Sequence, residues 1–307
     1  MTNITRINYY NVLAMLASAG LALFIPFELM LLSYAILGPL HYLTEISWLN
    51  TRQFFTIKKY DYLLIAAVVI VSVLFKLPSA NLVYYAFGLS FILLVINNTL
   101  YRILAFLLLI AMGYFLLTQN ILRTIFGLYI PTLIHVYIFT GAFMLLGALR
   151  VKSISGYIAF ITFLICPLLL CVLFTNIKST PTQWAIKEYA YFAHINTITL
   201  RNQTINVYGN TASIILTRVI AFAYTYHYIN WFSKTKVINW HRITKVTTAM
   251  ILLIWLASVA LYFYNYRTGI KWLLVLSLTH VILEFPLNHR SFIDIGKQIR
   301  QRSSSAK

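Results

Sequence analysis

The feature that most constrains this chain is its succession of long apolar segments, each close to the length of a membrane-crossing helix. A helix needs roughly 20 mainly apolar residues to cross a hydrocarbon core of about 30 Å. Such segments lie at 8–25, 27–49, 60–76, 80–98, 102–120, 125–149, 154–175, 210–232, 243–265 and 269–287. The pattern predicts an all-α protein, a polytopic bundle of about ten transmembrane helices. Only Pro26 separates the first two segments, so nine helices, the first of them broken, is the alternative.

The composition excludes a soluble fold. Hydrophobic residues make up 61% of the 307 residues and charged residues only 10%, whereas soluble domains average about 45–50% and about 25%. So few polar side chains cannot cover a globule of this size, and lipid has to cover it instead. We therefore expect an integral membrane protein whose partners include membrane lipids.

The basic residues predict the orientation of the chain. The net charge is +18, from 24 basic and six acidic residues. These basic residues are dispersed in short loops, so we expect no nucleic-acid partner and interpret them by the positive-inside rule. If the N-terminus is inside, 16 basic residues fall in the cytoplasm and seven outside, with Arg218 within a helix. Both termini are therefore predicted to be cytoplasmic, which agrees with an even number of helices.

The organisation expected is one transmembrane helical domain at 1–296 followed by a basic, disordered tail at 297–307. One long polar interruption, at about 176–208, is expected outside the membrane as a lid or an interfacial segment. Cys166 and Cys171 lie in one apolar run, and their spacing matches no metal or redox motif. They are expected to be buried as small hydrophobic residues.

Ionisable side chains at membrane depth are costly and usually mark function. Three of the six acidic residues fall within apolar segments: Glu28, Glu45 and Glu284. Four of the seven histidines lie inside expected helices: His41, His135, His227 and His280. These histidines come from four different segments at compatible depths, which makes a shared site possible.

Two of the four histidines have a glutamate four residues later, His41 with Glu45 and His280 with Glu284. Residues four apart on an α-helix lie on the same face, one turn along. Each pair therefore presents an imidazole and a carboxylate together. Either both groups bind one metal ion, or the carboxylate orients the imidazole by accepting its second N–H.

We expect one metal ion to be shared by these ligands: His41, His135, His227 and His280. Glu45 and Glu284 are expected to orient them or to add a ligand. A proton or ion pathway and purely structural hydrogen bonding between helices remain alternatives. No organic cofactor site and no catalytic side chain are indicated. Imidazole with carboxylate suits iron, zinc or manganese. Iron with an open position fits oxygen chemistry and zinc-activated water fits a lipid hydrolase, so iron is the expected metal and zinc the alternative.

The segment Gly38-Pro-Leu-His41-Tyr-Leu-Thr-Glu45 resembles the first conserved histidine segment of the Brp/Blh family, bacterial membrane dioxygenases that cleave beta-carotene to retinal. That segment reads roughly Gly-Leu-Pro-His-Gly-Ala-x-Asp in the family. The family's iron is held by histidines of separate helices, which implies an iron ligand at His41 and, more loosely, at His135, His227 and His280. Two departures are Tyr42 in place of glycine and Glu45 in place of aspartate. The family's second histidine motif has no clean counterpart around His135.

These observations predict a membrane-embedded, metal-dependent oxygenase with non-haem iron, acting on an apolar isoprenoid or carotenoid-like substrate. The resemblance implies a bacterial inner membrane. Aromatic residues near the ligands, including Tyr42, Tyr137 and Tyr228, are expected to line the site or to pack helices. A zinc-dependent lipid hydrolase resembling alkaline ceramidases stays open, although no aspartate lies at membrane depth beside Ser47 or Ser277. A proton-coupled transporter stays open, with a pathway formed by Glu28, Glu45, Glu284 and Arg218. A non-catalytic subunit of a larger complex also stays open.

Overall fold

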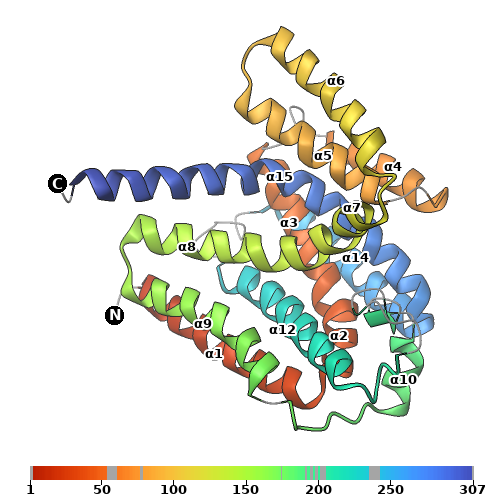
Figure 1. Ribbon diagram of the computed structural model, residues 1–307. Coiled ribbons are helices and arrows are strands. Elements are labelled where there is room, and N and C mark those ends of the chain that lie inside the picture. The colour runs from red at the N-terminus through yellow and green to blue at the C-terminus, as the bar shows by residue number, and fades with distance from the viewer. Residues whose placement is uncertain are drawn as a thin grey trace. The chain divides into compact units, whose positions relative to one another are not determined.

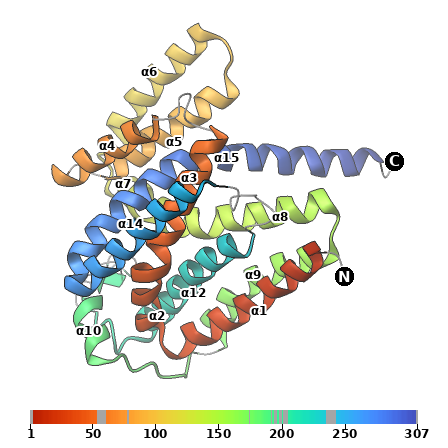
Figure 2. The same ribbon diagram turned by 180° about the vertical axis from the view of Figure 1, so that it is seen from behind.

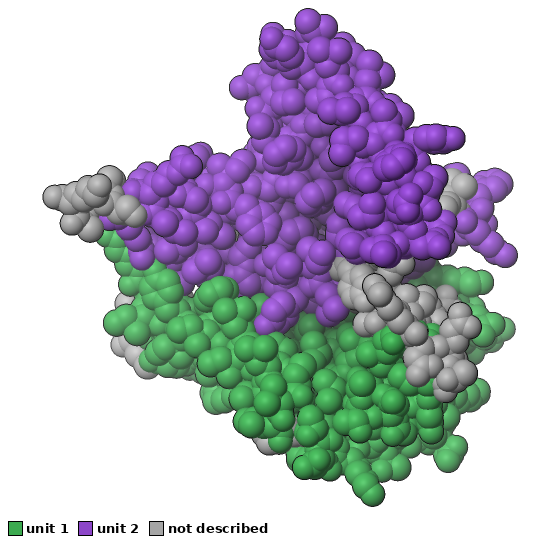
Figure 3. Space-filling view, in the orientation of Figure 1, with its two compact units in different colours: residues 1–41, 151–273 green, residues 42–150, 274–307 purple. Residues whose placement is uncertain are grey.

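The computed structural model describes residues 3–53, 61–76, 79–173, 175–190, 192–193, 196–197, 200, 205–234 and 243–305. These residues are mostly helical, and no strand occurs among them, which confirms the all-α prediction. The chain divides into two compact units (Figure 3). Unit 1 comprises Met1–His41 and Val151–Leu273, and unit 2 comprises Tyr42–Arg150 and Leu274–Lys307. The boundaries between the units fall at three points of the chain, and a single domain at 1–296 stays a prediction.

Unit 1 contains α1 (Asn3–Phe24), α2 (Pro26–Leu32), the π-helical turn η1 (Ser33–Leu37), α9 (Ile154–Val172), α10 (Gln183–Tyr189), α12 (Thr211–Ser233) and α14 (Lys245–Tyr264). It also holds the first residues of α3 (Gly38–Arg52) and of α15 (Tyr266–Ser305). α1 packs against α9 and α12, and α12 also packs against α2 (Figures 1 and 2).

Side-chain hydrogen bonds fix the relative directions of these helices. Near the start of α1, Asn8 donates to the hydroxyl of Ser155 at the start of α9, at 3.0 Å, so α1 and α9 are parallel. Asn11 of α1 donates to the hydroxyl of Ser233 at the end of α12, also at 3.0 Å, so α1 and α12 are antiparallel. The predicted orientation requires both relations.

Unit 2 contains the rest of α3 and α15 together with α4 (Asp61–Leu74), α5 (Ser79–Val95), α6 (Thr99–Leu116), α7 (Asn120–Thr124), the π-helix η2 (Ile125–Phe139) and α8 (Thr140–Val151). α5 packs against α6 and η2, and α7 packs against η2. Residues later in α15 contact residues later in η2 and α8. His135 faces His280, and fifteen residues later Arg150 pairs with Asp294. η2–α8 and α15 therefore run in parallel.

Seven helices among the described residues are long and apolar enough to cross a membrane: Ile4–Phe24, Pro26–Arg52, Thr99–Leu116, Leu133–Val151, Ile154–Val172, Lys245–Tyr264 and Tyr266–Arg302. The protein is thus a helical protein suited to membrane integration, while the predicted count of about ten spans is not confirmed. α4 and α5 are shorter, at 14 and 17 residues. α12 is long, but its Thr, Tyr, His, Asn and Arg residues lower its mean hydropathy.

Large apolar side chains point outward, as lipid contact requires. Tyr114 and Phe115 of α6 are 82% and 67% exposed, and Phe263 of α14 is 84% exposed. Soluble monomers rarely expose extended apolar patches. In a bilayer the same surface meets hydrocarbon at no cost.

The tail expected to be disordered is helical where it is described. α15 continues without interruption to Ser305, and the guanidinium of Arg302 donates to the carbonyl oxygen of Leu149 at 2.7 Å. Extending an existing helix avoids the costly nucleation step, and this contact with α8 holds the last turns. The final residues 306–307 lie outside the described part.

The long polar interruption contains α10, which is anchored in unit 1. Tyr208 donates through its hydroxyl to the carbonyl oxygen of Ile186 at 2.9 Å. The hydroxyl of Tyr189 donates to Asn196, whose amide in turn donates to Ser213 of α12. Residues 191, 194–195, 198–199 and 201–204 of this segment lie outside the described part. The described residues belong to unit 1 and form no separate domain.

Candidate metal centre

The polar centre of unit 2 begins with His135, which is supplied by η2. A π-helix is rare and is frequently found at functional sites. Pro131 lies within η2 and lacks the N–H that a regular helical hydrogen bond would use. The imidazole of His135 is 1% exposed.

His280 and Glu284 of α15 meet His135. The Nε2 atoms of His135 and His280 are 3.0 Å apart, and Glu284 Oε2 is 3.2 Å from His135 Nε2. One helical turn separates His280 from Glu284, so a single helix brings both groups to the same face. All three side chains are buried, and each can offer one ligand atom within 4.8 Å of the others.

This arrangement fits a metal ion. Ligand bonds of about 2.0–2.2 Å at right angles put neighbouring donor atoms roughly 3 Å apart. The measured separations of 3.0 and 3.2 Å match that value. Two imidazoles and one carboxylate are also a donor set that non-haem Fe(II) and catalytic zinc accept. In the absence of a metal, these side chains can instead hydrogen-bond to one another.

α3 completes the surroundings of this centre with Tyr42 and Glu45. The Tyr42 ring stacks on the His280 imidazole, with centroids 4.2 Å apart and planes inclined by 24°. This contact restricts the orientation of the imidazole. Glu45 is 3% exposed and lies close enough to Glu284 for the two carboxyl groups to interact electrostatically. Two buried carboxylates are costly in apolar surroundings unless protons or a cation compensate them, and a divalent ion would.

His41 and His227 form a second histidine pair, which belongs to unit 1. Their Nε2 atoms are 3.0 Å apart. Rings of Tyr228, Trp231 and Phe232 surround His41, with centroids at 5.1, 5.6 and 6.5 Å. α12 provides these three rings and His227 itself, so the aromatic-rich stretch noted in the sequence packs around a histidine pair.

The six residues predicted for the metal centre are all at most 8% exposed: His41, Glu45, His135, His227, His280 and Glu284. Within unit 2 the structure brings His135, His280 and Glu284 together, and within unit 1 it brings His41 and His227 together. The binding of one ion by all four histidines stays a prediction. Glu284, expected to orient a histidine or to add a ligand, lies among these donor atoms.

Glu28 and Arg218, considered for a transport pathway, both hold the segment that follows α9. Glu28 Oε1 accepts a hydrogen bond from the backbone N–H of Thr182 at 2.6 Å. The guanidinium of Arg218, fully buried in α12, donates to the carbonyl oxygen of Ile177 and the hydroxyl of Ser179. Such contacts indicate an anchoring role in unit 1.

Two functional features were not found from the sequence. Asn288 lies one turn beyond Glu284 on α15 and is 1% exposed, and its i+4 spacing was the available signal. Arg150 and Asp294 form an ion pair, but their separation of 144 residues left no local pattern. Of the other histidines, His289 packs on Phe87, with ring centroids 4.4 Å apart, and His194 and His241 lie outside the described residues.

Comparisons with known proteins identified no relative of this chain. A scan against protein-family models, a search of curated proteins and a search of solved structures each found no match.

Proposed function

We propose that this protein is a membrane-embedded, metal-dependent oxygenase that uses non-haem iron. The observation that carries the proposal is the convergence of His135, His280 and Glu284 within unit 2. Two histidines and one carboxylate bind Fe(II) on one side and leave positions open on the other. Iron held in this way supplies the activation of O₂.

The protein's own contribution is to hold and shelter the centre. His135, His280 and Glu284 would bind the metal, and Tyr42 fixes the plane of the His280 ring. Buried apolar neighbours on α15, including Val281 and Leu283, would exclude bulk water from the centre. Exclusion of water strengthens electrostatic interactions and prevents side reactions.

The substrate class follows from the membrane setting and from the resemblance to the Brp/Blh family at His41 and Glu45. An apolar isoprenoid or carotenoid-like molecule dissolves in the bilayer and reaches a buried centre sideways. The same resemblance supports a bacterial inner membrane. Both termini would then be cytoplasmic, as the distribution of basic residues indicates.

Parallel packing in unit 2 agrees with the predicted order of crossings. If η2–α8 and α15 both cross the membrane, they cross it in the same direction. The chain between them must then cross an odd number of times, and α9, α12 and α14 provide three crossings.

A zinc-dependent lipid hydrolase is the second candidate, because two histidines and a glutamate also hold catalytic zinc. Metal analysis of detergent-purified protein by mass spectrometry separates the two. About one iron per chain supports the oxygenase, and about one zinc supports the hydrolase. Protein purified without any bound metal, and unable to take up either ion, would contradict both and favour proton-coupled transport.

A further inference from the structure

A stripe of polar residues follows one face of α15 away from the metal centre. Its members recur every three or four residues, the spacing that returns to one helical face: His280, Glu284, Asn288, Ser291 and Asp294. We call these five residues the polar stripe, and all belong to unit 2. The first four are at most 3% exposed, whereas the Asp294 side chain is 36% exposed. The polar stripe thus leads from a buried centre to the surface.

Asn288 is the buried amide side chain of the polar stripe. Its amide is a hydrogen-bonding neighbour of the Glu284 carboxyl, which leaves at least one polar atom of the amide without a direct hydrogen bond to a described residue. A buried polar group without a partner costs about 1–3 kcal/mol. Buried water binds two to four polar groups. The Glu284 carboxyl and the two polar atoms of the Asn288 amide are three such groups.

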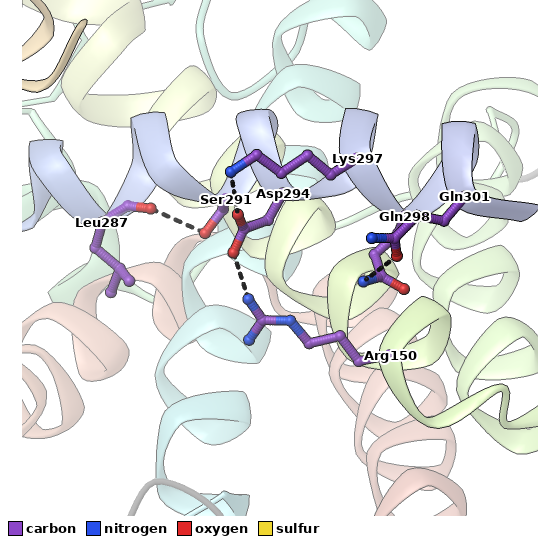
Figure 4. A network of polar contacts seen from close by, with 7 residues as sticks. All are labelled: Arg150, Leu287, Ser291, Asp294, Lys297, Gln298 and Gln301. Carbon is purple, nitrogen blue, oxygen red and sulfur yellow. Dashed lines mark hydrogen bonds and ion pairs between the residues drawn. The ribbon is translucent and has the colours of Figure 1, made fainter.

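The outer half of the polar stripe continues with groups that can bind water. Ser291 donates to the carbonyl oxygen of Leu287 at 2.9 Å, and its hydroxyl oxygen can still accept hydrogen bonds. Asp294 lies beyond it, 2.5 Å from Arg150 and 3.9 Å from Lys297. Both ion pairs are drawn in Figure 4. The mouth of the stripe therefore carries two positive charges around one carboxylate.

The distances along α15 suit single water molecules. At a rise of 1.5 Å per residue, Asn288, Ser291 and Asp294 lie about 6, 10 and 15 Å beyond Glu284 along the axis. A water molecule hydrogen-bonded on both sides spans roughly 5.5 Å. One water in each interval is enough to connect the carboxyl of Glu284 to Asp294.

We propose that the polar stripe is a hydrated path along which water reaches the metal centre from the surface at Asp294. Its inner end rests on the proposed function, because the centre that receives the water is the one formed by His135, His280 and Glu284. Arg150 and Lys297 at the mouth disfavour the passage of metal cations, so water is the occupant. The path supplies water ligands to open coordination positions.

The test uses D₂O as a probe of the size of water. In the full-length protein, with Cys166 and Cys171 replaced by alanine, a single thiol is introduced by Asn288→Cys or Ser291→Cys. Phe285→Cys is the matched control. Phe285 lies between Glu284 and Asn288 in depth, is fully buried and packs against Phe87 away from the polar stripe. The S–H stretching band of each variant is followed by infrared spectroscopy after transfer into D₂O.

A thiol exchanges its proton only where water reaches it, since exchange requires ionisation and apolar surroundings suppress the thiolate. We expect the S–H bands of Asn288→Cys and Ser291→Cys to disappear at least about tenfold faster than that of Phe285→Cys. Equal rates in all three variants would overturn the proposal, whether the rates are fast or slow. If Asn288→Cys does not fold, Ser291→Cys against Phe285→Cys decides alone, because Ser and Cys are nearly isosteric.

This experiment needs no metal, so its outcome is separate from that of the metal analysis. Slow exchange in a protein that binds iron would contradict the proposed water path and leave the oxygenase proposal intact. Fast exchange in a protein that binds no metal would support the water path and contradict the oxygenase proposal.

Discussion

Glu45 and Glu284 should respond differently to the same substitution. Both follow a histidine by four residues, so the sequence treats them alike. In the structure, Glu284 Oε2 is 3.2 Å from His135 Nε2, at the separation of neighbouring ligand atoms. Glu45 interacts with Glu284 but is not among the converging donor atoms of unit 2. Glu284→Gln should therefore remove a metal ligand, whereas Glu45→Gln should only disturb one.

The expected magnitudes follow from these two roles. Loss of a group that supports a ligand typically weakens metal binding about 10–100-fold, or about 1.4–2.7 kcal/mol. Removal of one partner from a buried charged interaction costs about 3–5 kcal/mol, which corresponds to roughly 150- to 5,000-fold. Glu284→Gln should therefore weaken binding by a larger factor than Glu45→Gln does.

The assay is a competition titration with a chromophoric chelator, with Zn²⁺ as the probe and purified protein in detergent. Thermal unfolding of both metal-free variants is the control for folding, because Glu45 and Glu284 are each 3% exposed. Equal losses of affinity, or a larger loss for Glu45→Gln in folded protein, would show that Glu284 is not a ligand. Unchanged affinity in both variants would contradict the assignment of a metal centre to unit 2.

Three further predictions concern the ligands, the topology and the surface ion pair. His280→Ala should abolish stoichiometric metal in purified protein, whereas His289→Ala, also buried on α15, should retain it; equal metal content would contradict the ligand assignment. Reporter fusions should show cytoplasmic activity at Lys307 and external activity near Gln203, and periplasmic activity at Lys307 would refute the orientation. Asp294→Asn should change the free energy of unfolding by no more than about 1 kcal/mol, because exposed ion pairs contribute little; thermal unfolding would reveal a larger loss.

Local patterns predicted the helices well. Each of the ten apolar segments overlaps a helix in the described part of the chain, because hydropathy is a property of neighbouring residues. The pairing of His280 with Glu284 was predictable for the same reason, since one turn of one helix relates them. The count of about ten spans is not confirmed, because α4 and α5 are short and α12 carries buried polar groups such as Arg218 and His227.

Contacts between distant segments could not be predicted. His135 had no acidic neighbour in the sequence and was the weakest candidate by local pattern. Its partner Glu284 is 149 residues away, and only the packing of η2 against α15 brings the two together. The helical end of the tail was missed because its polar composition is typical of disorder, whereas the contact of Arg302 with Leu149 depends on tertiary structure.

The parallel packing of η2–α8 and α15 also explains why water would need a path through the protein. The sequence offset between the two chains is 145 at His135 and His280 and 144 at Arg150 and Asp294. Phe139 and Phe292 lie between these two contacts with an offset of 153, so the two segments run in parallel but do not advance residue for residue. Fourteen residues of α15 separate His280 from Asp294, which is about 21 Å along the axis. The apolar segment predicted at 269–287 ends seven residues after His280, about 10 Å along the axis, so the donor atoms lie inside a hydrocarbon core of about 30 Å. Lipid does not carry polar ligands to such a depth, so water for the metal centre has to pass between α15 and its neighbours.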